Sequence, residues 1–404
     1  MLTINEPQQS ASQNKHQYVW QHPVFDLLFR SHFILASLAS IISLTIWLSY
    51  MTHGLALSHG GLSPLVWHIH EMIFTFASTV AVGFILTAVQ TWTGKSSIKG
   101  LKAFLLVVMW VFSHTLFWAN TQMTVTIALV LKAFWWLAVI GFYAEIVIST
   151  NNRRNFIFIP LLTVMATLNL SIVILDLADS SSLALHLAKT MVLVFVVLIT
   201  ILGGRVIPFF TVNGAKTPPI PPISWLENLV FVLAIGSAIL YFLNAWFNLN
   251  TVLSATLLIS GACQLLRVSK WRSLNTFHVP LLWSLHLAYL FMAAGLIGMG
   301  LSFISVFNEL PTTYGFHLIT IGSIGFMILS MMSRVSLGHT GRMLKIPRIV
   351  VIAFILMIAA TLTRVVLPAL GMVTWGWTIS ALCWVIAFTI FLFYYTPILT
   401  KTRL

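Results

Sequence analysis

Twelve long apolar segments recur along the chain, and they constrain its fold more than any other feature. Each has about the 20 residues needed to cross roughly 30 Å of hydrocarbon, and the connections between them are short. The chain is 59% hydrophobic and 7% charged, with a mean hydropathy of +0.98, a composition that excludes a soluble protein. The sequence therefore predicts an all-α integral membrane protein, a single domain of twelve transmembrane helices over residues 31–398. The segments lie near 31–53, 64–90, 100–119, 122–148, 155–175, 182–204, 224–246, 250–268, 279–303, 312–336, 347–369 and 374–398.

Basic residues are distributed unevenly between the two sides of these helices. Of the 21 Lys and Arg residues, 18 fall on the side of the two termini and three lie within helices. Because Lys and Arg concentrate in cytoplasmic loops, both termini are predicted to be cytoplasmic. Residues 1–30 are predicted to form a tail and interfacial segment, and 399–404 a second tail. The net charge of +13 is thus explained by the loops, so the expected partner is the lipid bilayer and no nucleic acid is expected.

The second apolar segment, from Gly61 to Gly94, contains the most unusual cluster of polar residues. Ser63 and Pro64 are typical of a helix start, which places the helix end at the membrane surface. His68, His70 and Glu71 then lie on the order of 6 to 10 Å inside. Ionisable side chains at this depth are rare and usually face a protein interior or a cavity. The cluster is therefore our primary candidate for a functional site.

Helical geometry separates the two histidines of this cluster. His68 and His70 differ by about 200° around the axis and should face opposite ways. Two sites on either side of the helix are possible, or one metal ligand and one hydrogen-bonding histidine. Glu71 and Met72 are expected to share the face of His68, where Glu71 can orient an imidazole and the Met72 sulfur can approach copper. The alternative is a polar cluster that only ties helices together.

Further histidines fall at a matching depth in the outer half of other helices. They are His114 in the third, His186 in the sixth and His317 in the tenth segment. Imidazole is the commonest nitrogen ligand of haem iron, copper and zinc, so these residues are candidate ligands, although a lone histidine often only forms hydrogen bonds. The similar second, sixth and tenth segments also suggest three pseudo-repeats of four helices.

Two cations within the helices have candidate roles. Lys189 lies on the same helix face as His186 and at the depth of Glu71, so an ion pair between Lys189 and Glu71 is expected. Arg364 in the eleventh segment can either extend its guanidinium to the membrane surface or neutralise haem propionates. Both alternatives remain open at this stage.

Several motifs carry a resemblance to a known family. They are PLVWHIHEM and GFILTAVQTWTG in the second segment, GGRVIPFFT after the sixth, and HLITIGSIGFMILSMMSRVSLGHTGR in the tenth. Together they resemble the NnrS family of bacterial haem- and copper-containing membrane proteins, nearly end to end. The resemblance implies an inner-membrane location and a role in the response to nitric oxide, often alongside denitrification. Subunit I of haem-copper oxidases is similar in helix number, but there the paired histidines lie in helix 10.

The histidines and the family resemblance together predict a protein that binds haem, and copper as a second metal. The resemblance further implies nitric oxide as a ligand in nitrosative stress. Cys263 and Cys383 form no CxxCH pattern, so the haem is expected to be non-covalent and b-type. Whether the protein is a redox enzyme stays open. The alternative function is a secondary transporter of a small solute or metal, which twelve helices with few buried charges also suit. A transporter would give a colourless preparation and substrate-dependent flux.

Overall fold

Long helices make up nearly all of the structure, a computed structural model that describes residues 18–57, 60–307 and 309–404. Within these residues twelve helices are long and apolar enough to cross a membrane, which confirms the predicted all-α fold of a multi-pass membrane protein. Most of the predicted N-terminal tail, residues 1–17, lies outside the described residues. The first six spans are α1 (Leu28–His53), α2 (Pro64–His70) with η3 (Glu71–Ala77) and α3 (Ser78–Thr93), α4 (Leu101–Ala119), α5 (Gln122–Ser149), α6 (Phe158–Leu177) and α7 (Ser181–Gly214). The last six are α8 (Ser224–Leu243), α9 (Asn250–Ser269), α10 (Pro280–Leu301), α11 (Thr312–His317) with η7 (Leu318–Gly325) and α12 (Phe326–Gly338), α13 (Arg348–Ala369) and α14 (Val373–Leu399).

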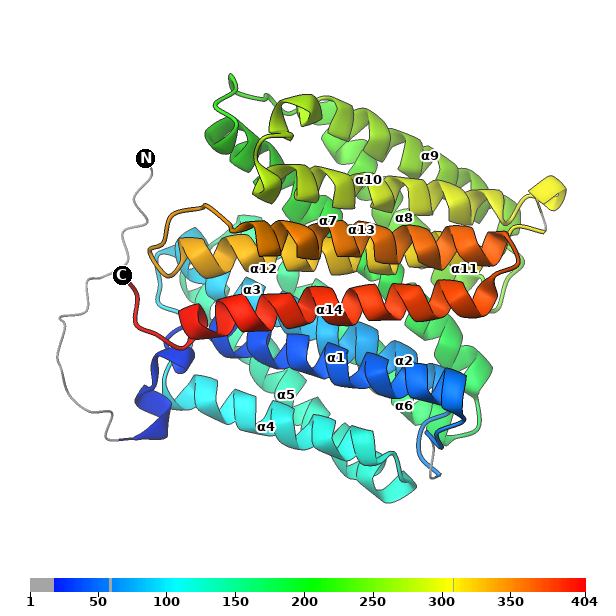
Figure 1. The fold of residues 1–404 in the computed structure, drawn as a ribbon, viewed down its shortest axis with the longest axis horizontal. Helices are drawn as coiled ribbons and strands as arrows, with labels where there is room; N and C mark the ends of the chain where they lie inside the picture. The colour runs from blue at the N-terminus through cyan, green and yellow to red at the C-terminus, as the bar shows by residue number, and fades with distance from the viewer. Residues whose placement is uncertain (1–17, 58–59, 308) are drawn as a thin grey trace.

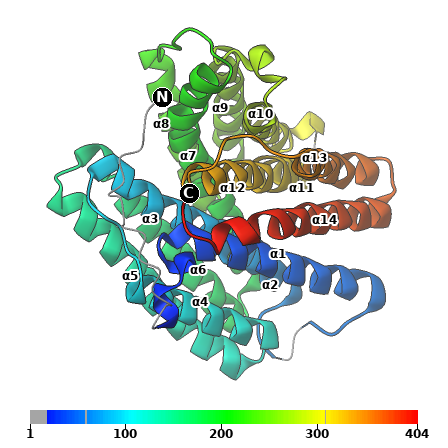
Figure 2. The ribbon, with the colours of Figure 1, turned by 60° about the vertical axis from the view of Figure 1, so that its left-hand side comes forward.

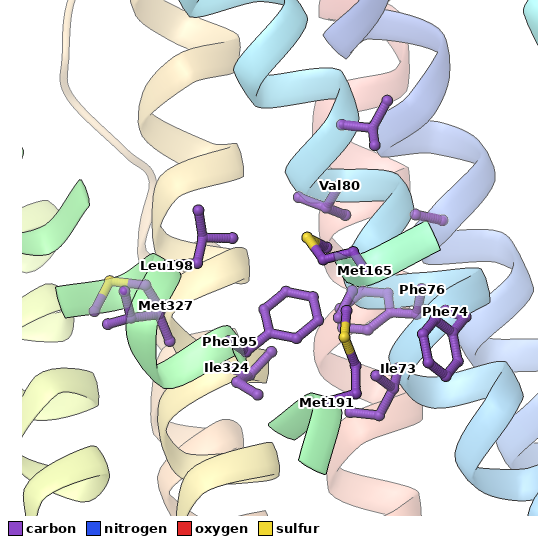
Figure 3. Packing of buried hydrophobic residues seen from close by; sticks show 14 of the residues in the cluster. Ile73, Phe74, Phe76, Val80, Met165, Met191, Phe195, Leu198, Ile324 and Met327 are labelled. Carbon is purple, nitrogen blue, oxygen red and sulfur yellow. The ribbon is translucent and has the colours of Figure 1, made fainter. Parts of the chain in front are cut away.

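The second, sixth and tenth spans form the centre of the bundle. In their most apolar windows 83%, 78% and 72% of the residues are buried inside the protein, compared with 61% or less in every other span. Phe76, Phe195 and Ile324, one from each central span, lie close together in the packed interior (Figure 3). The remaining helices surround this core, with α1, α13 and α14 packed side by side along one flank (Figures 1 and 2). The three spans that carry His68, His186 and His317 are therefore the least exposed to lipid.

Two of the central spans change their helical form directly after a histidine. The second span becomes a π-helix over Glu71–Ala77, immediately after His70, and the tenth over Leu318–Gly325, immediately after His317. Ser78 donates its hydroxyl to the carbonyl oxygen of Ile73, five residues earlier (2.9 Å). π-helical segments are rare and are frequently found at functional sites. Their position marks both histidines as structurally unusual.

The sixth span is longer than the sequence predicts. Glycines and prolines after residue 202 indicated a helix end, but α7 continues through Pro208 to Gly214. A proline inside a helix removes one backbone hydrogen bond, and membrane helices tolerate this because neighbouring groups satisfy the freed carbonyl. Gly204 has a packing role instead, since a Cβ atom there would collide with the Arg267 guanidinium. The glycine thus allows a side chain of α9 to approach α7 closely.

The two ends of the described chain lie at the same end of the bundle (Figure 1). Arg30 in the first turn of α1 is 1% exposed and donates from Nη1 to the carbonyl oxygen of Lys401 (2.6 Å). The start of the first helix is thereby fixed to the end of the last. The side of the membrane on which both ends lie stays a prediction from the loop charges.

Cysteine labelling in intact cells tests that orientation. Lys99, between α3 and α4, is exposed on the side of the termini, and Glu309, between α10 and α11, is exposed on the opposite side. In a variant without Cys263 and Cys383, we expect Glu309→Cys to react with a membrane-impermeant maleimide and Lys99→Cys to react only after permeabilisation. The reverse labelling pattern would refute the predicted orientation.

Candidate functional site

A cavity of about 290 Å³ lies within the bundle at the level of His68 and His317. His68 reaches it from α2, and His317 reaches it from the last residue of α11. Its other walls come from α1, α7, α13 and α14 and are mainly apolar. The aromatic members of the wall are Trp47, Phe76, Phe316, Trp377 and Trp384, and Met51 and Met72 contribute sulfur atoms. The structure thus brings together two of the predicted ligands that are about 250 residues apart in sequence.

The His68 imidazole is held by stacking rather than by hydrogen bonds. It lies on the indole of Trp47, with ring centroids 4.3 Å apart and planes inclined by 13°. Within the described residues neither of its ring nitrogens forms a hydrogen bond to the protein. Both nitrogens are therefore available to a ligand in the cavity. Trp47 was not identified from the sequence, because one tryptophan in an apolar span gives no signal beyond membrane packing.

The His317 imidazole is oriented by the backbone of its own helix. Its Nδ1 lies 2.8 Å from the carbonyl oxygen of Thr313. A carbonyl only accepts hydrogen bonds, so Nδ1 carries the proton and Nε2 has a free lone pair in the neutral ring. Histidines that bind metals are commonly fixed in this way by a hydrogen bond from the other nitrogen. The geometry therefore prepares His317 to coordinate through Nε2.

Two cations line the same cavity, and no carboxylate is present among its described lining residues. Arg364 of α13 lies over the Trp377 ring, 5.3 Å from its centroid, and interacts electrostatically with His68 and His317. Lys189 of α7 lies 5.9 Å from the centroid of the Phe316 ring. Unpaired positive charge at this depth is costly, so an anionic group inside the cavity would stabilise it.

A haem fits this set of residues. A b-type haem needs an apolar pocket, one or two axial ligands and positive charge for its two propionates. The cavity supplies apolar walls, imidazoles from two central spans, and the two cations. Within the described chain no three His, Cys, Asp or Glu side chains are grouped closely enough to hold a metal ion. A haem needs no such group, because the porphyrin supplies four of the iron's ligands.

His70 faces a second and separate polar cluster on the other side of the second span. Its Nδ1 donates to Oε1 of Glu71 (3.1 Å), and both side chains are fully buried. The prediction that His68 and His70 face opposite ways is confirmed. Glu71 was expected to share the face of His68 and is instead on the side of His70. Helical angles place Glu71 nearer to His68, at about 60°, than to His70, at about 100°. The hydrogen-bond donors of α1 and α4 nevertheless hold its carboxylate on the side of His70.

Glu71 accepts four hydrogen bonds. Oε1 accepts from His70 and from the Thr75 hydroxyl (2.9 Å), and Oε2 accepts from the Ser43 hydroxyl (2.9 Å) and from Nε1 of Trp118 (2.9 Å). Each oxygen of the carboxylate therefore accepts two hydrogen bonds, which is the full capacity of an ionised carboxylate. A proton on either oxygen would displace one of these donors. The cluster therefore stabilises a negative charge in the membrane interior.

The positive charge that balances Glu71 comes from α5 through a relay of two side chains. Nζ of Lys132 donates to Nε2 of His114 (3.0 Å), and Nδ1 of His114 donates to the Thr75 hydroxyl (2.9 Å). Thr75 in turn donates to Glu71. Both nitrogens of His114 are thus occupied by protein groups. Sequence reasoning placed Lys132 inside a helix without assigning it to the site, although a lysine at mid-depth is a signal in itself.

The predicted ion pair between Lys189 and Glu71 is wrong for the described structure. Glu71 is hydrogen-bonded on the side of α1 and α4, whereas Lys189 lines the His68 cavity on the opposite side of the second span. Equal depth in the membrane does not imply a shared face. The two charges therefore belong to different sites.

His186 lies outside the cavity. Its Nε2 donates to the carbonyl oxygen of Tyr241 (2.8 Å), and its ring stacks on the Tyr241 ring with centroids 4.7 Å apart. It thus connects α7 to the end of α8. His186, predicted as a candidate metal or haem ligand, is not brought together with His68 and His317 in the structure.

The fold and these two clusters define a polytopic membrane protein with an intramembrane histidine site in its central helices. A sequence model of the NnrS protein family matches residues 23–403, nearly the whole chain. The chain therefore belongs to the NnrS family, as its motifs indicated. This membership supports a broad role in the response to nitric oxide. No curated protein matches the chain. The likeness to haem-copper oxidases and the four-helix repeat stay predictions.

Proposed function

We propose that the protein binds a b-type haem in the cavity between His68 and His317 and acts through it in the response to nitric oxide. The observation that supports this most is the pair of imidazoles facing one apolar cavity, each with an unoccupied nitrogen. His68 and His317 would hold the haem iron, and Arg364 and Lys189 would neutralise the propionates. Bound haem would supply a redox-active iron that can coordinate nitric oxide.

The protein's own residues contribute orientation and a low-dielectric environment. Trp47 fixes the plane of the His68 ring, and the Thr313 carbonyl fixes the tautomer of His317. The indole rings of Trp377 and Trp384 help exclude water from the cavity. Nitric oxide is small and uncharged, so it can enter from the hydrocarbon region, where an apolar wall presents no barrier to it. These features suit binding of a diatomic ligand in the membrane interior.

Copper remains a second proposal for the same region. Met72 is one turn from His68 on the same cavity wall, and a thioether beside an imidazole suits copper.

His70 also has a nitrogen available, because its Nε2 is buried and has no hydrogen-bond partner among the described residues. Its surroundings are the rings of Phe117 and Phe74, and both nitrogens of nearby His114 are occupied. The donor set around His70 therefore fits copper less well than the cavity does.

Spectroscopy and metal analysis of the purified protein test the proposed function. We expect an optical spectrum of b-type haem, extractable by acidic acetone, with about one iron per chain, and a shift of the Soret band when nitric oxide is added. Copper is measured on the same sample and decides the second proposal separately. A colourless preparation without iron, combined with solute flux in proteoliposomes, would overturn the haem proposal in favour of a secondary transporter.

A further inference from the structure

A second cavity, of about 760 Å³, lies at the end of the bundle that carries the chain termini. It is bordered by α7, α8, the end of α9 and the segment that precedes α6. None of the residues discussed for the haem cavity lines it. Four basic side chains and one carboxylate face it, from parts of the chain up to 116 residues apart. They are Arg154, Arg205, Arg267, Lys270 and Glu227.

The inner part of the cavity is electrically balanced. Arg267 donates from Nε to Oε1 of Glu227 (2.9 Å) and from Nη2 to Oε2, so the pair is bidentate. Its Nη1 donates to the carbonyl oxygen of Thr200 (2.9 Å) and to the hydroxyl of Tyr289 (2.8 Å). Arg267 is 4% exposed. The Arg267 guanidinium therefore has its hydrogen bonds satisfied by protein groups. It pairs with Glu227, the only carboxylate among the described residues that line the cavity.

The outer part of the cavity has an excess of positive charge. Arg154, Arg205 and Lys270 form no ion pair with any described carboxylate. Arg205 donates to Oδ1 of Asn155 (2.8 Å) and to the carbonyl oxygen of Arg154 (3.3 Å), which are both neutral groups. The charges of Arg154 and Arg205 are close enough to repel each other. Three uncompensated cations in the lining of one cavity favour an anionic ligand there.

The walls next to these cations are apolar and extend into the membrane. Phe209 is 49% exposed, and Ile201, Val212 and Phe231 lie along the same cavity. The lining of α7 runs from Thr200 to Val212, which corresponds to about 18 Å along the helix axis. Trp225 at the start of α8 is 59% exposed, as is typical of tryptophan at the headgroup level. The cavity thus combines a basic rim with an apolar wall along α7.

We propose that this cavity binds an anionic phospholipid, with its phosphate among Arg154, Arg205 and Lys270 and an acyl chain along Phe209. The recognised chemistry is a phosphate ester, and the apolar wall selects a lipid over a soluble phosphate. Basic pockets between transmembrane helices commonly bind anionic headgroups. A bound lipid would connect the segment before α6 to the ends of α7 and α9.

The test compares lipid retention by native mass spectrometry after the purified protein is mixed with phosphatidylglycerol, phosphatidylcholine or inorganic phosphate. The test variant is Arg154→Gln combined with Lys270→Gln, two exposed residues whose side chains form no hydrogen bond or ion pair in the described structure. The matched control is Arg153→Gln combined with Arg348→Gln, which removes two exposed charges from the same side but outside the cavity.

We expect the unmodified protein and the control to retain one phosphatidylglycerol in preference to phosphatidylcholine. The test variant should bind it at least about tenfold more weakly, with an unchanged melting temperature without lipid. Equal weakening in test and control variants would show general surface attraction and overturn the site. Undiminished retention by the test variant would also overturn it. Competition by millimolar phosphate, with no preference for phosphatidylglycerol, would assign the cavity to a soluble phosphate instead.

Discussion

Replacing either His68 or His317 with alanine should remove most of the haem from the purified protein. Each variant loses one of the two residues proposed to hold the haem iron, and the proposed haem is a non-covalent one. We expect haem content to fall by more than the roughly tenfold that loss of an outer-shell partner causes. Haem extracted and measured per mole of protein checks the loss, and the optical spectrum of any remaining haem reports its ligation. The variants His68→Gly and His317→Gly should regain haem when free imidazole is added, because the vacated space fits that ring.

His186→Ala is the matched control for this prediction. It removes an imidazole at similar depth from α7, the central span that carries neither His68 nor His317. This imidazole lies outside the cavity and donates to the Tyr241 carbonyl. His70→Ala is a second control, since His70 faces the Glu71 cluster. Both controls should keep their haem spectrum. Full haem retention in both His68→Ala and His317→Ala, or equal loss in His186→Ala, would contradict the proposed site.

The second large effect should come from separating the buried charges of Glu71 and Lys132. Glu71→Gln leaves Lys132 without a balancing charge, and Lys132→Met leaves Glu71 without one. Removing one partner of a buried pair typically costs about 3 to 5 kcal/mol of stability. The double variant should be more stable than the sum of the two changes predicts, by about 1 to 3 kcal/mol. Unfolding of the purified proteins in a denaturing detergent series measures these free energies.

Lys189→Met provides the control for this cycle when haem-free protein is used. Lys189 is also an intramembrane lysine, but within the described chain it has no hydrogen-bond or ion-pair partner, and its Nζ lies over the face of the Phe316 ring. Its replacement should change the free energy of unfolding by about 1 kcal/mol or less. If the changes in the free energy of unfolding caused by Glu71→Gln and Lys132→Met simply add in the double variant, the relay through His114 and Thr75 does not couple the two charges.

Local features of the sequence determined the helices and drew attention to the spans that carry histidines. Apolar segments of sufficient length predicted all twelve spans, because a bilayer requires every backbone group to be paired within the span. Histidines at one depth marked the second, third, sixth and tenth segments, and three of these, the second, sixth and tenth, are the most buried spans in the structure. The opposite directions of His68 and His70 followed from the fixed angle per residue in a helix. The prediction at the end of α7 was wrong, because Pro208 can remain helical when neighbouring helices surround it.

Contacts between spans were decided by the tertiary structure alone. Depth along the membrane normal can be read from a sequence, but rotation about that normal relative to other helices cannot. This is why Lys189 and Glu71, at equal depth, lie on different sides of the second span, and why His186 bonds to α8 instead of lining the cavity. Packing inside the bundle also decided which groups meet. Trp47 stacks on His68, and Arg364 interacts electrostatically with both cavity histidines. Lys132 is linked to Glu71 through His114 and Thr75.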